Sequence, residues 1–142
     1  MILLDTNVVS EAWKKQPVET VIRWIDEQPA TSLYLCTPVL AELRFGAERL
    51  PESRRKNHIR ALIDRLETDL YGGRILTLDA AAAAEFGRIA AKKQRAGRRM
   101  QPMDALIAAV AISNGAALAT RDVQDFSGLD LTVVNPFDQN VA

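Results

Sequence analysis

The chain has few of the side chains on which disulfide frameworks and zinc sites depend. Cys36 is its only cysteine and His58 its only histidine among 142 residues. A disulfide framework, a Cys-rich zinc site and any site with two His ligands are therefore excluded. Cys36 lies inside an apolar run, where a cysteine usually serves packing and not nucleophilic chemistry.

Charge of one sign and long hydrophobic runs are also missing. The 18 basic and 18 acidic residues cancel, which argues against nucleic-acid binding by bulk charge but leaves room for a local basic patch. The longest apolar run, residues 105–112, falls far short of the roughly 20 residues that a membrane span needs. No targeting segment is recognisable at the N-terminus. We expect a soluble protein of a reducing cytoplasm with no membrane partner.

Apolar residues make up 48% of the chain, enough for one buried core at this length. Short apolar runs alternate with longer segments whose apolar residues recur at helical spacing. The predicted strands are residues 2–4, 33–36, 74–78, 117–119 and 131–134; the predicted helices are residues 17–28, 38–49, 51–70, 80–96 and 102–114. Thr37 is the expected N-cap of the second helix, and Asp79 that of the fourth. Strands that are apolar throughout and separated by helices predict an α/β fold with a mainly parallel five-stranded sheet, covered by helices on both faces. Without repeats or linkers, residues 1–142 are expected to form a single domain.

Four acids come at the ends of these elements. Asp5 directly follows the first strand, and Asp122 closely follows the fourth, so parallel strands would bring both to the same edge of the sheet. Glu42 lies on an apolar row in the first two turns of its helix. Asp104 is the only charged residue near the start of a helix that is otherwise apolar all round, which indicates burial.

Each acid also has an ordinary structural interpretation: Asp5 as a helix cap or turn residue, Asp104 as a partner of its helix dipole, Glu42 as a surface side chain and Asp122 as a loop acid. These interpretations do not explain four acids at element ends in apolar settings. Carboxylates about 5 Å apart repel by on the order of 3 kcal/mol per pair at an effective dielectric near 20. Protons or hard divalent cations such as Mg²⁺ or Mn²⁺ would relieve that repulsion, and such cations support phosphate chemistry.

The basic residues gather in two places. The first group precedes Asp104 and comprises Arg88, Lys92, Lys93, Arg98 and Arg99, with no acid between Arg88 and Gln101. The second group, around residues 54–60, is more typical of a solvated helix face. Phosphate contacts from the first group would give salt-dependent RNA binding with little sequence preference.

Several of these segments resemble one family. They are MILLDTNVVSE at residues 1–11, VLAELRFG at 39–46, DALIAA at 104–109, ATRD at 119–122 and the VNPF ending at 134–137. In this order and spacing they resemble PIN-domain ribonuclease toxins of the VapC type, in particular the FitB-like branch. The resemblance covers nearly the whole chain.

The resemblance implies a metal-dependent endoribonuclease that is the toxin of a toxin–antitoxin pair and hydrolyses RNA phosphodiester bonds with water activated by Mg²⁺ or Mn²⁺. Asp5, Glu42, Asp104 and Asp122 would be the catalytic metal ligands, and Thr6, Asn7 and Thr120 would support them by hydrogen bonds. Asp125 is a rival or additional ligand, because many members carry Asn at the position of Asp122 and an Asp three residues later. The resemblance also implies a cognate antitoxin, a homodimer and a larger assembly with the antitoxin on operator DNA.

Other classes use the same edge of a sheet. A haloacid-dehalogenase-type phosphatase needs a second Asp where Asn7 stands, and a phospho-receiver domain needs a Lys after a late strand, whereas no Lys follows Lys93. The alternative that remains is a catalytically weak PIN-like module that binds RNA or a partner without cutting.

Overall fold

Five parallel strands form the centre of the structure, a computed structural model that describes residues 1–138. They are β1(Ile2–Leu4), β2(Leu33–Cys36), β3(Ile75–Leu76), β4(Ala117–Ala119) and β5(Val133–Val134), in the spatial order β3-β2-β1-β4-β5. All four pairings are parallel. The predicted sheet is confirmed; residues 139–142, the end of the expected domain, lie outside the described part.

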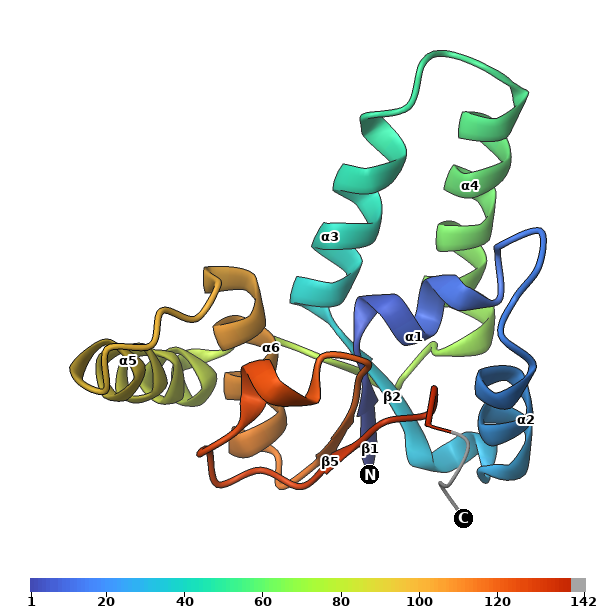
Figure 1. The fold of residues 1–142 in the computed structure, drawn as a ribbon. Helices are drawn as coiled ribbons and strands as arrows, with labels where there is room; N and C mark the ends of the chain where they lie inside the picture. The colour runs from blue at the N-terminus through green and yellow to red at the C-terminus, as the bar shows by residue number, and fades with distance from the viewer. Residues whose placement is uncertain (139–142) are drawn as a thin grey trace.

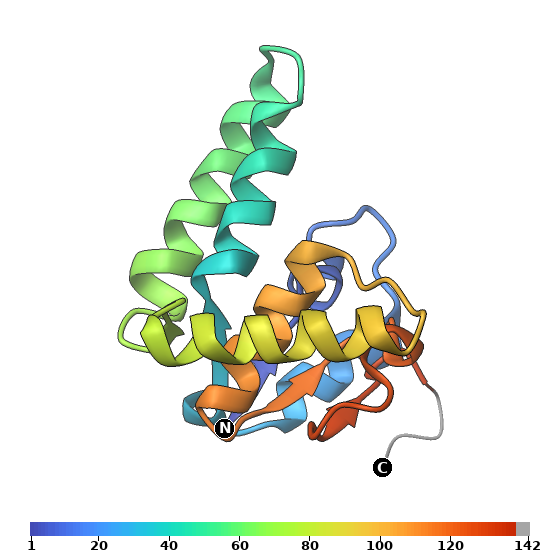
Figure 2. The same cartoon turned by 90° about the vertical axis from the view of Figure 1, so that its left-hand side faces the viewer.

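Helices follow or link the strands: α1(Thr6–Glu11), α2(Glu19–Glu27), α3(Thr37–Glu48), α4(Arg54–Arg65), α5(Ala80–Arg95) and α6(Pro102–Ser113). Two short 3₁₀ segments, η1(Ala30–Ser32) and η3(Val123–Phe126), and a π-helical turn, η2(Leu66–Leu70), complete the path. The helices α5 and α6 lie on one side of the sheet and α2 on the other (Figure 1), which the rotated view also shows (Figure 2). Within residues 1–138, no helix is long and apolar enough to cross a membrane.

The core lies between the sheet and α6. Leu3, Leu35 and Leu118 on neighbouring strands are fully buried, and Ile107 and Val110 of α6 are buried as well. The helix α6 packs mainly against α5 and also contacts α3 and β4. The prediction that an all-round apolar helix is buried is confirmed, and this burial brings Asp104 in its first turn into an environment poor in water.

The helix α1 was not predicted. Its sequence has low helix propensity because it includes Thr6 and the β-branched pair Val8 and Val9. Asp5 caps it by accepting a hydrogen bond from the Thr6 amide at 2.8 Å, and both valines are buried in the core. Tertiary packing therefore supplies the stability that the local sequence lacks.

Two further predictions are corrected. The third strand is limited to β3, although residues 74–78 were expected to form it. Thr37 was expected to cap α3, but the cap position is Cys36 and Thr37 lies within the helix. The Thr37 hydroxyl instead accepts a hydrogen bond from the Leu78 amide at 3.1 Å, which ties the segment after β3 to the start of α3.

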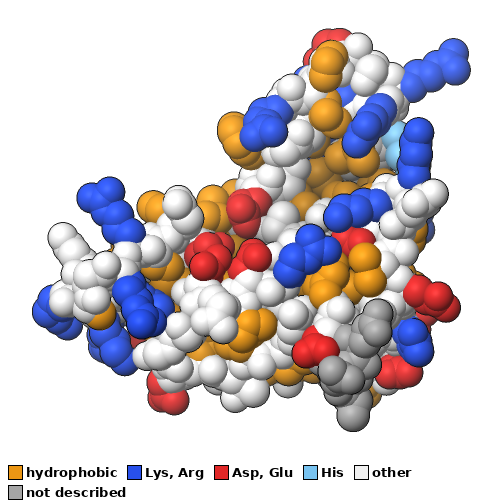
Figure 3. Space-filling view, in the orientation of Figure 1, with side chains coloured by type: hydrophobic (Ala, Val, Ile, Leu, Met, Phe, Trp, Pro, Cys, Tyr) orange, Lys and Arg blue, Asp and Glu red, His pale blue; other side chains and the backbone are white. Residues whose placement is uncertain are grey.

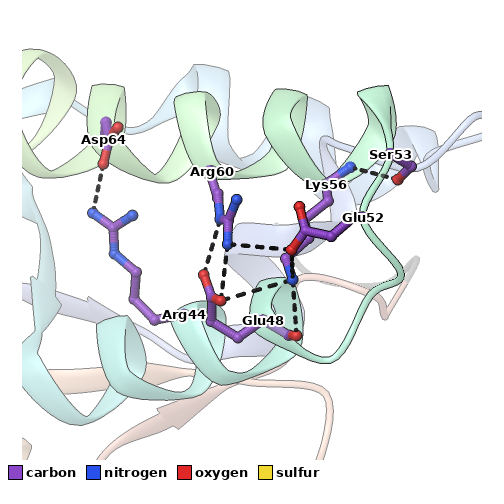
Figure 4. Close-up of polar contacts among 7 residues, drawn as sticks. All are labelled: Arg44, Glu48, Glu52, Ser53, Lys56, Arg60 and Asp64. Carbon is purple, nitrogen blue, oxygen red and sulfur yellow. Dashed lines mark hydrogen bonds and ion pairs between the residues drawn. The ribbon is translucent and has the colours of Figure 1, made fainter.

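The α3–α4 hairpin projects away from the sheet (Figures 1 and 2). Ion pairs cross it: Arg44 Nη2 lies 2.7 Å from Asp64 Oδ1, and Arg60 contacts Glu48 through two nitrogens at 2.9 Å each (Figure 4). Lys56 is buried at 5% exposure and donates to the Glu48 carbonyl oxygen at 3.2 Å. Lys56 and Arg60 of the second basic group therefore fasten the hairpin.

Candidate functional site

The site is built where β1 and β4 end side by side. Leu4 pairs with Ala119, and the Asp5 amide donates to the Ala119 carbonyl oxygen at 2.9 Å. That pairing brings Asp5 next to Thr120, whose hydroxyl donates to Asp5 Oδ2 at 2.6 Å. Asp5 is 3% exposed and Thr120 is fully buried, so these two side chains form the floor of the site.

Glu42 reaches the same edge from α3. The half-buried Glu42 carboxylate accepts a hydrogen bond from the Thr6 hydroxyl at 2.5 Å. Because α3 begins directly after β2, the strand next to β1, its early turns stand above the carboxyl end of the sheet. The structure therefore brings Glu42 beside Asp5 across 37 positions of sequence, through Thr6 of α1.

Asn7 links the acids on the other side. Its Nδ2 lies 3.1 Å from Asp122 Oδ2 and 3.5 Å from Asp5 Oδ2, so one amide group donates toward both carboxylates. Its Oδ1 accepts from the Arg121 amide at 3.2 Å. The Asp122 amide in turn donates to the Thr120 hydroxyl at 3.1 Å. The segment after β4 is thus held to the start of α1 by side-chain contacts.

Asp104 completes the group from the first turn of α6. Its pKa is raised to about 6, first by burial and then by the charges of Asp5, Asp125, Glu42 and Asp122 in that order. The pKa of Asp5 is also raised, chiefly by burial, with Glu42 and Asp122 adding to the effect while Thr120 and Thr6 oppose it. Five predicted acids therefore act on one another electrostatically at one edge. Figure 3 shows acidic side chains grouped between the base of α3 and α6.

The donor set fits a hard divalent cation, since it offers carboxylate oxygens with hydroxyl and amide groups behind them. Within residues 1–138, however, no three Asp, Glu, His or Cys side chains stand close enough to form a ready metal site. Asp125 acts on Asp104 electrostatically, and its backbone amide donates to the Asp122 carbonyl oxygen at 3.0 Å.

The predicted basic residues separate into two kinds. Lys93 is buried and donates to the Ser127 carbonyl oxygen at 2.6 Å, and Lys92 donates to the Gly128 carbonyl oxygen at 2.9 Å. Arg88 pairs with Glu85. The Lys93 ammonium group therefore holds the chain segment after η3, and its part in RNA binding stays a prediction.

Arg98 and Arg99 are exposed and lie beside the acids. With Lys93 they line a cavity of about 370 Å³ together with Asp104 and Asp125. Figure 3 shows basic side chains gathered at one end of the face that also carries the acidic group. Anionic and cationic side chains thus share one hollow.

Comparison with known proteins decides the family. The PIN-domain model matches residues 2–130. This chain belongs to the PIN-domain family. It is 36% identical to toxin FitB of Neisseria gonorrhoeae, covering 96% of this chain and 99% of that protein, and 36% identical to VapC ribonuclease Y4jK of Sinorhizobium fredii, covering 97% and 99%. The solved structure of FitAB bound to the IR36 DNA fragment matches with a TM-score of 0.91 and 35% identity over 99% of each chain.

Three residues of this PIN domain that sequence reasoning passed over support the Asp122 segment. The Arg121 guanidinium carbon lies 3.8 Å from the centre of the Phe137 ring, and its Nη2 lies 4.0 Å from Oε2 of the buried Glu11. Glu11 also pairs with Lys14 at 2.8 Å. The position of Arg121, directly before a predicted ligand, was the available signal, but its partners are distant in sequence.

Proposed function

We propose that this PIN domain is a metal-dependent endoribonuclease that acts as the toxin of a toxin–antitoxin pair. The observation that carries the proposal is the shared electrostatics of Asp104, whose pKa is raised to about 6 by burial and by four other acids. A fold keeps such a group where a cation or a proton offsets the repulsion. Relatives named as ribonucleases, including the tRNA(fMet)-specific endonuclease VapC of Shigella flexneri, at 32% identity, support the reaction class.

In this proposal Asp5, Glu42, Asp104 and Asp122 hold the metal, and Asp125 takes part through water. PIN-domain ribonucleases are generally metal-dependent, and the oxygen donors here suit Mg²⁺ or Mn²⁺. A bound ion would supply Lewis acidity toward a phosphodiester and lower the pKa of the attacking water. Thr6, Asn7 and Thr120 keep their carboxylates oriented through the hydrogen bonds described above.

The chain's own residues supply the rest of the reaction. Arg98 and Arg99 are exposed beside Asp104, where they can bind phosphates flanking the one that is cut. Asp5 and Thr120 are buried at the floor of the site, and the hydrogen bond between them keeps the Asp5 carboxylate fixed in orientation. Positioning and charge stabilisation are the main contributions in phosphoryl chemistry of this kind.

The proposal extends to the partners. The structures titled FitAB bound to the IR36 DNA fragment and VapBC2 from Rickettsia felis bound to a promoter DNA fragment support a cognate antitoxin and an assembly on operator DNA. We expect a homodimer as in the family, a cytoplasmic location, and residues 1–142 acting as one PIN domain.

The test is cleavage of total cellular RNA by the purified chain, free of antitoxin, with Mg²⁺ or Mn²⁺, with EDTA, and with Asp104→Asn. New RNA ends are mapped by sequencing. The matched control is Asp26→Asn, which neutralises an exposed acid on α2. Discrete ends with wild type and Asp26→Asn, absent with EDTA and with Asp104→Asn, are the expected result.

Equal cutting by wild type and Asp104→Asn would contradict the site assignment. The spacing of the acids, which leaves no ready three-ligand group among residues 1–138, favours a non-cutting binding module as the second candidate. RNA binding that is indifferent to metal, together with no cutting by any variant, would support that module instead.

A further inference from the structure

The cavity beside Asp104 is lined by amide and thioether side chains as well as by charged ones. Its walls come from the α5–α6 connection and from η3, and it is lined by Lys93, Arg98, Arg99, Met100, Gln101, Asp104, Gln124 and Asp125. At about 370 Å³ it lies near the lower end of the size range of small-molecule sites. It therefore has room for one small planar group and not for a helix or a folded peptide segment.

Two amide side chains in this cavity make no hydrogen bond to the rest of the described chain. Gln101 and Gln124 are exposed, and neither side-chain amide has a hydrogen-bond partner among residues 1–138. Each amide offers a donor and an acceptor side by side. Met100 directly precedes Gln101, is half-buried and lines the same cavity, and its thioether gives the cavity an apolar, polarisable surface.

We propose that this cavity binds one unstacked base of single-stranded RNA next to the phosphate that is cut. Gln101 and Gln124 read the edge of the base, Met100 packs on its face, and Arg98 and Arg99 hold neighbouring phosphates. This inference rests on the proposed nuclease function and names the residues that set its base preference, which act on a single-stranded segment because only there are base edges free to be read. Cleavage therefore prefers one or two bases at a fixed position beside the cut.

The charges favour a nucleotide over a peptide. A basic side chain entering the cavity meets Lys93, Arg98 and Arg99, and an acidic one meets Asp104 and Asp125. In a nucleotide the negative charge is on the phosphate, whereas the base, whose edge is recognised, is neutral. It can place the phosphate toward the arginines and the base against the amides without opposing either set of charges.

The test measures binding separately from cutting. The metal-free full-length chain in EDTA, labelled with ¹⁵N, is titrated with four RNA trinucleotides, one for each base, while the side-chain NH₂ signals of Gln101 and Gln124 are followed. Gln101→Ala and Gln124→Ala assign the two signals. Gln94→Ala, an exposed residue of α5 outside the cavity lining, is the matched control.

We expect both signals to move with one or two of the four trinucleotides, and the affinity for those to fall about tenfold in each cavity variant, the selectivity that a paired amide gives. Gln94→Ala should bind as wild type does. In a random-sequence RNA pool with Mg²⁺, the base preference beside the cut should weaken in the two cavity variants while cutting continues.

Three outcomes would overturn the inference: no movement of either signal with any trinucleotide, equal affinity for all four bases, or binding unchanged in both cavity variants. Movement with a basic peptide and not with RNA would assign the cavity to a protein partner. Base-selective binding without any metal-dependent cutting would contradict the nuclease and leave the base site intact, so the two failures are distinguishable.

Discussion

The hydroxyl of Thr120 donates to Asp5 Oδ2 over 2.6 Å, with both side chains buried beneath the acidic edge. The same hydroxyl oxygen accepts from the Asp122 amide at 3.1 Å. One threonine thus orients the carboxylate that follows β1 and the backbone that follows β4. It also opposes the rise that burial causes in the pKa of Asp5, so it helps to keep this carboxyl ionised.

Thr120→Val should reduce RNA cleavage by about 10- to 100-fold, the usual cost of removing a partner that orients a metal ligand. Valine keeps the shape of threonine but cannot make either hydrogen bond. The initial cleavage rate is measured against Mg²⁺ concentration, with Thr132→Val, at an exposed threonine before β5, as the control. A higher Mg²⁺ requirement is expected, together with a lower melting temperature, because the buried Asp5 carboxylate and the Asp122 amide each lose a hydrogen-bond partner. Full activity at low Mg²⁺ would show that Thr120 is not needed to orient Asp5.

The raised pKa of Asp104 predicts a pH dependence for metal binding. Below pH 6 its carboxyl group is largely protonated, and the proton competes with the metal. Mg²⁺ affinity should fall about tenfold per pH unit as the pH drops below that value. Calorimetric titration between pH 5 and 8 measures this, and Asp26→Asn should follow wild type. An affinity that stays constant across this range would contradict the assignment of Asp104.

The Asp104 carboxyl group should also make the metal-free protein less stable as the pH rises. Its folded-state pKa is about 6 against an ordinary value of 3.8, so between these values the folded chain binds more protons than the unfolded chain, and stability falls with increasing pH. Asp104→Asn should therefore raise the melting temperature in EDTA at pH 7.5 and have little effect at pH 3.5. Part of the pH dependence of stability should persist in Asp104→Asn, because the pKa of Asp5 is raised as well. A lower melting temperature at pH 7.5 would refute this.

The salt dependence of RNA binding should separate Lys93, which has a structural role, from Arg98 and Arg99, which we propose bind RNA. Each phosphate contact contributes about 0.7 to the slope of log affinity against log salt for single strands. Arg98→Gln and Arg99→Gln should each reduce the slope by roughly that amount. Lys93→Met should leave the slope unchanged but lower thermal stability, because Lys93 donates to the Ser127 carbonyl oxygen inside the fold. Filter binding in EDTA across a salt series measures the slopes; equal losses in all three variants would contradict the distinction.

Much of the architecture was predictable because it depends on local apolar patterns. The runs at β1, β2 and β4 are continuous, and the composition of α6 allows only a buried helix. Asp79 was predicted to cap α5, and it does so by accepting from the Ala82 amide at 2.9 Å. The short helix α1 was missed because it is stabilised by tertiary contacts of Val8 and Val9 and not by its own propensity.

The candidate acids were predictable from their places at the ends of elements, but their supporting contacts were not. Lys93 and Arg98 look alike in sequence, and only the fold shows that one is buried against η3 while the other is exposed. The stacking of Arg121 on Phe137 joins positions 16 residues apart, which no local pattern reveals. The structural roles of Lys93 and Arg121 depend on burial and on contacts with residues distant in sequence, and these were not predictable from local patterns.

The Arg121–Phe137 contact should act through the position of Asp122. Arg121→Met keeps most of the side-chain volume but loses the cation–π contact, which is worth roughly 0.5–1 kcal/mol at a partly exposed site. Cleavage should fall about 2- to 5-fold through a higher Mg²⁺ requirement, with the KM for RNA unchanged. Arg121→Lys should recover part of the loss, since an ammonium group can also lie over the ring. A rise in KM alone would instead make Arg121 an RNA contact.

The α3–α4 hairpin should depend on Lys56 more than on the acids around it. Lys56 buries its methylene stem and donates to the Glu48 carbonyl oxygen, whereas Glu52 is exposed and pairs with Lys56 from the surface. Lys56→Ala should destabilise the chain by about 2 kcal/mol, from lost apolar burial and an unpaired carbonyl group. Glu52→Gln should have a much smaller effect that disappears at high salt. Urea unfolding of both variants, at low and high salt, measures the difference. Equal destabilisation would mean that the ion pair, and not the buried stem, holds the hairpin together.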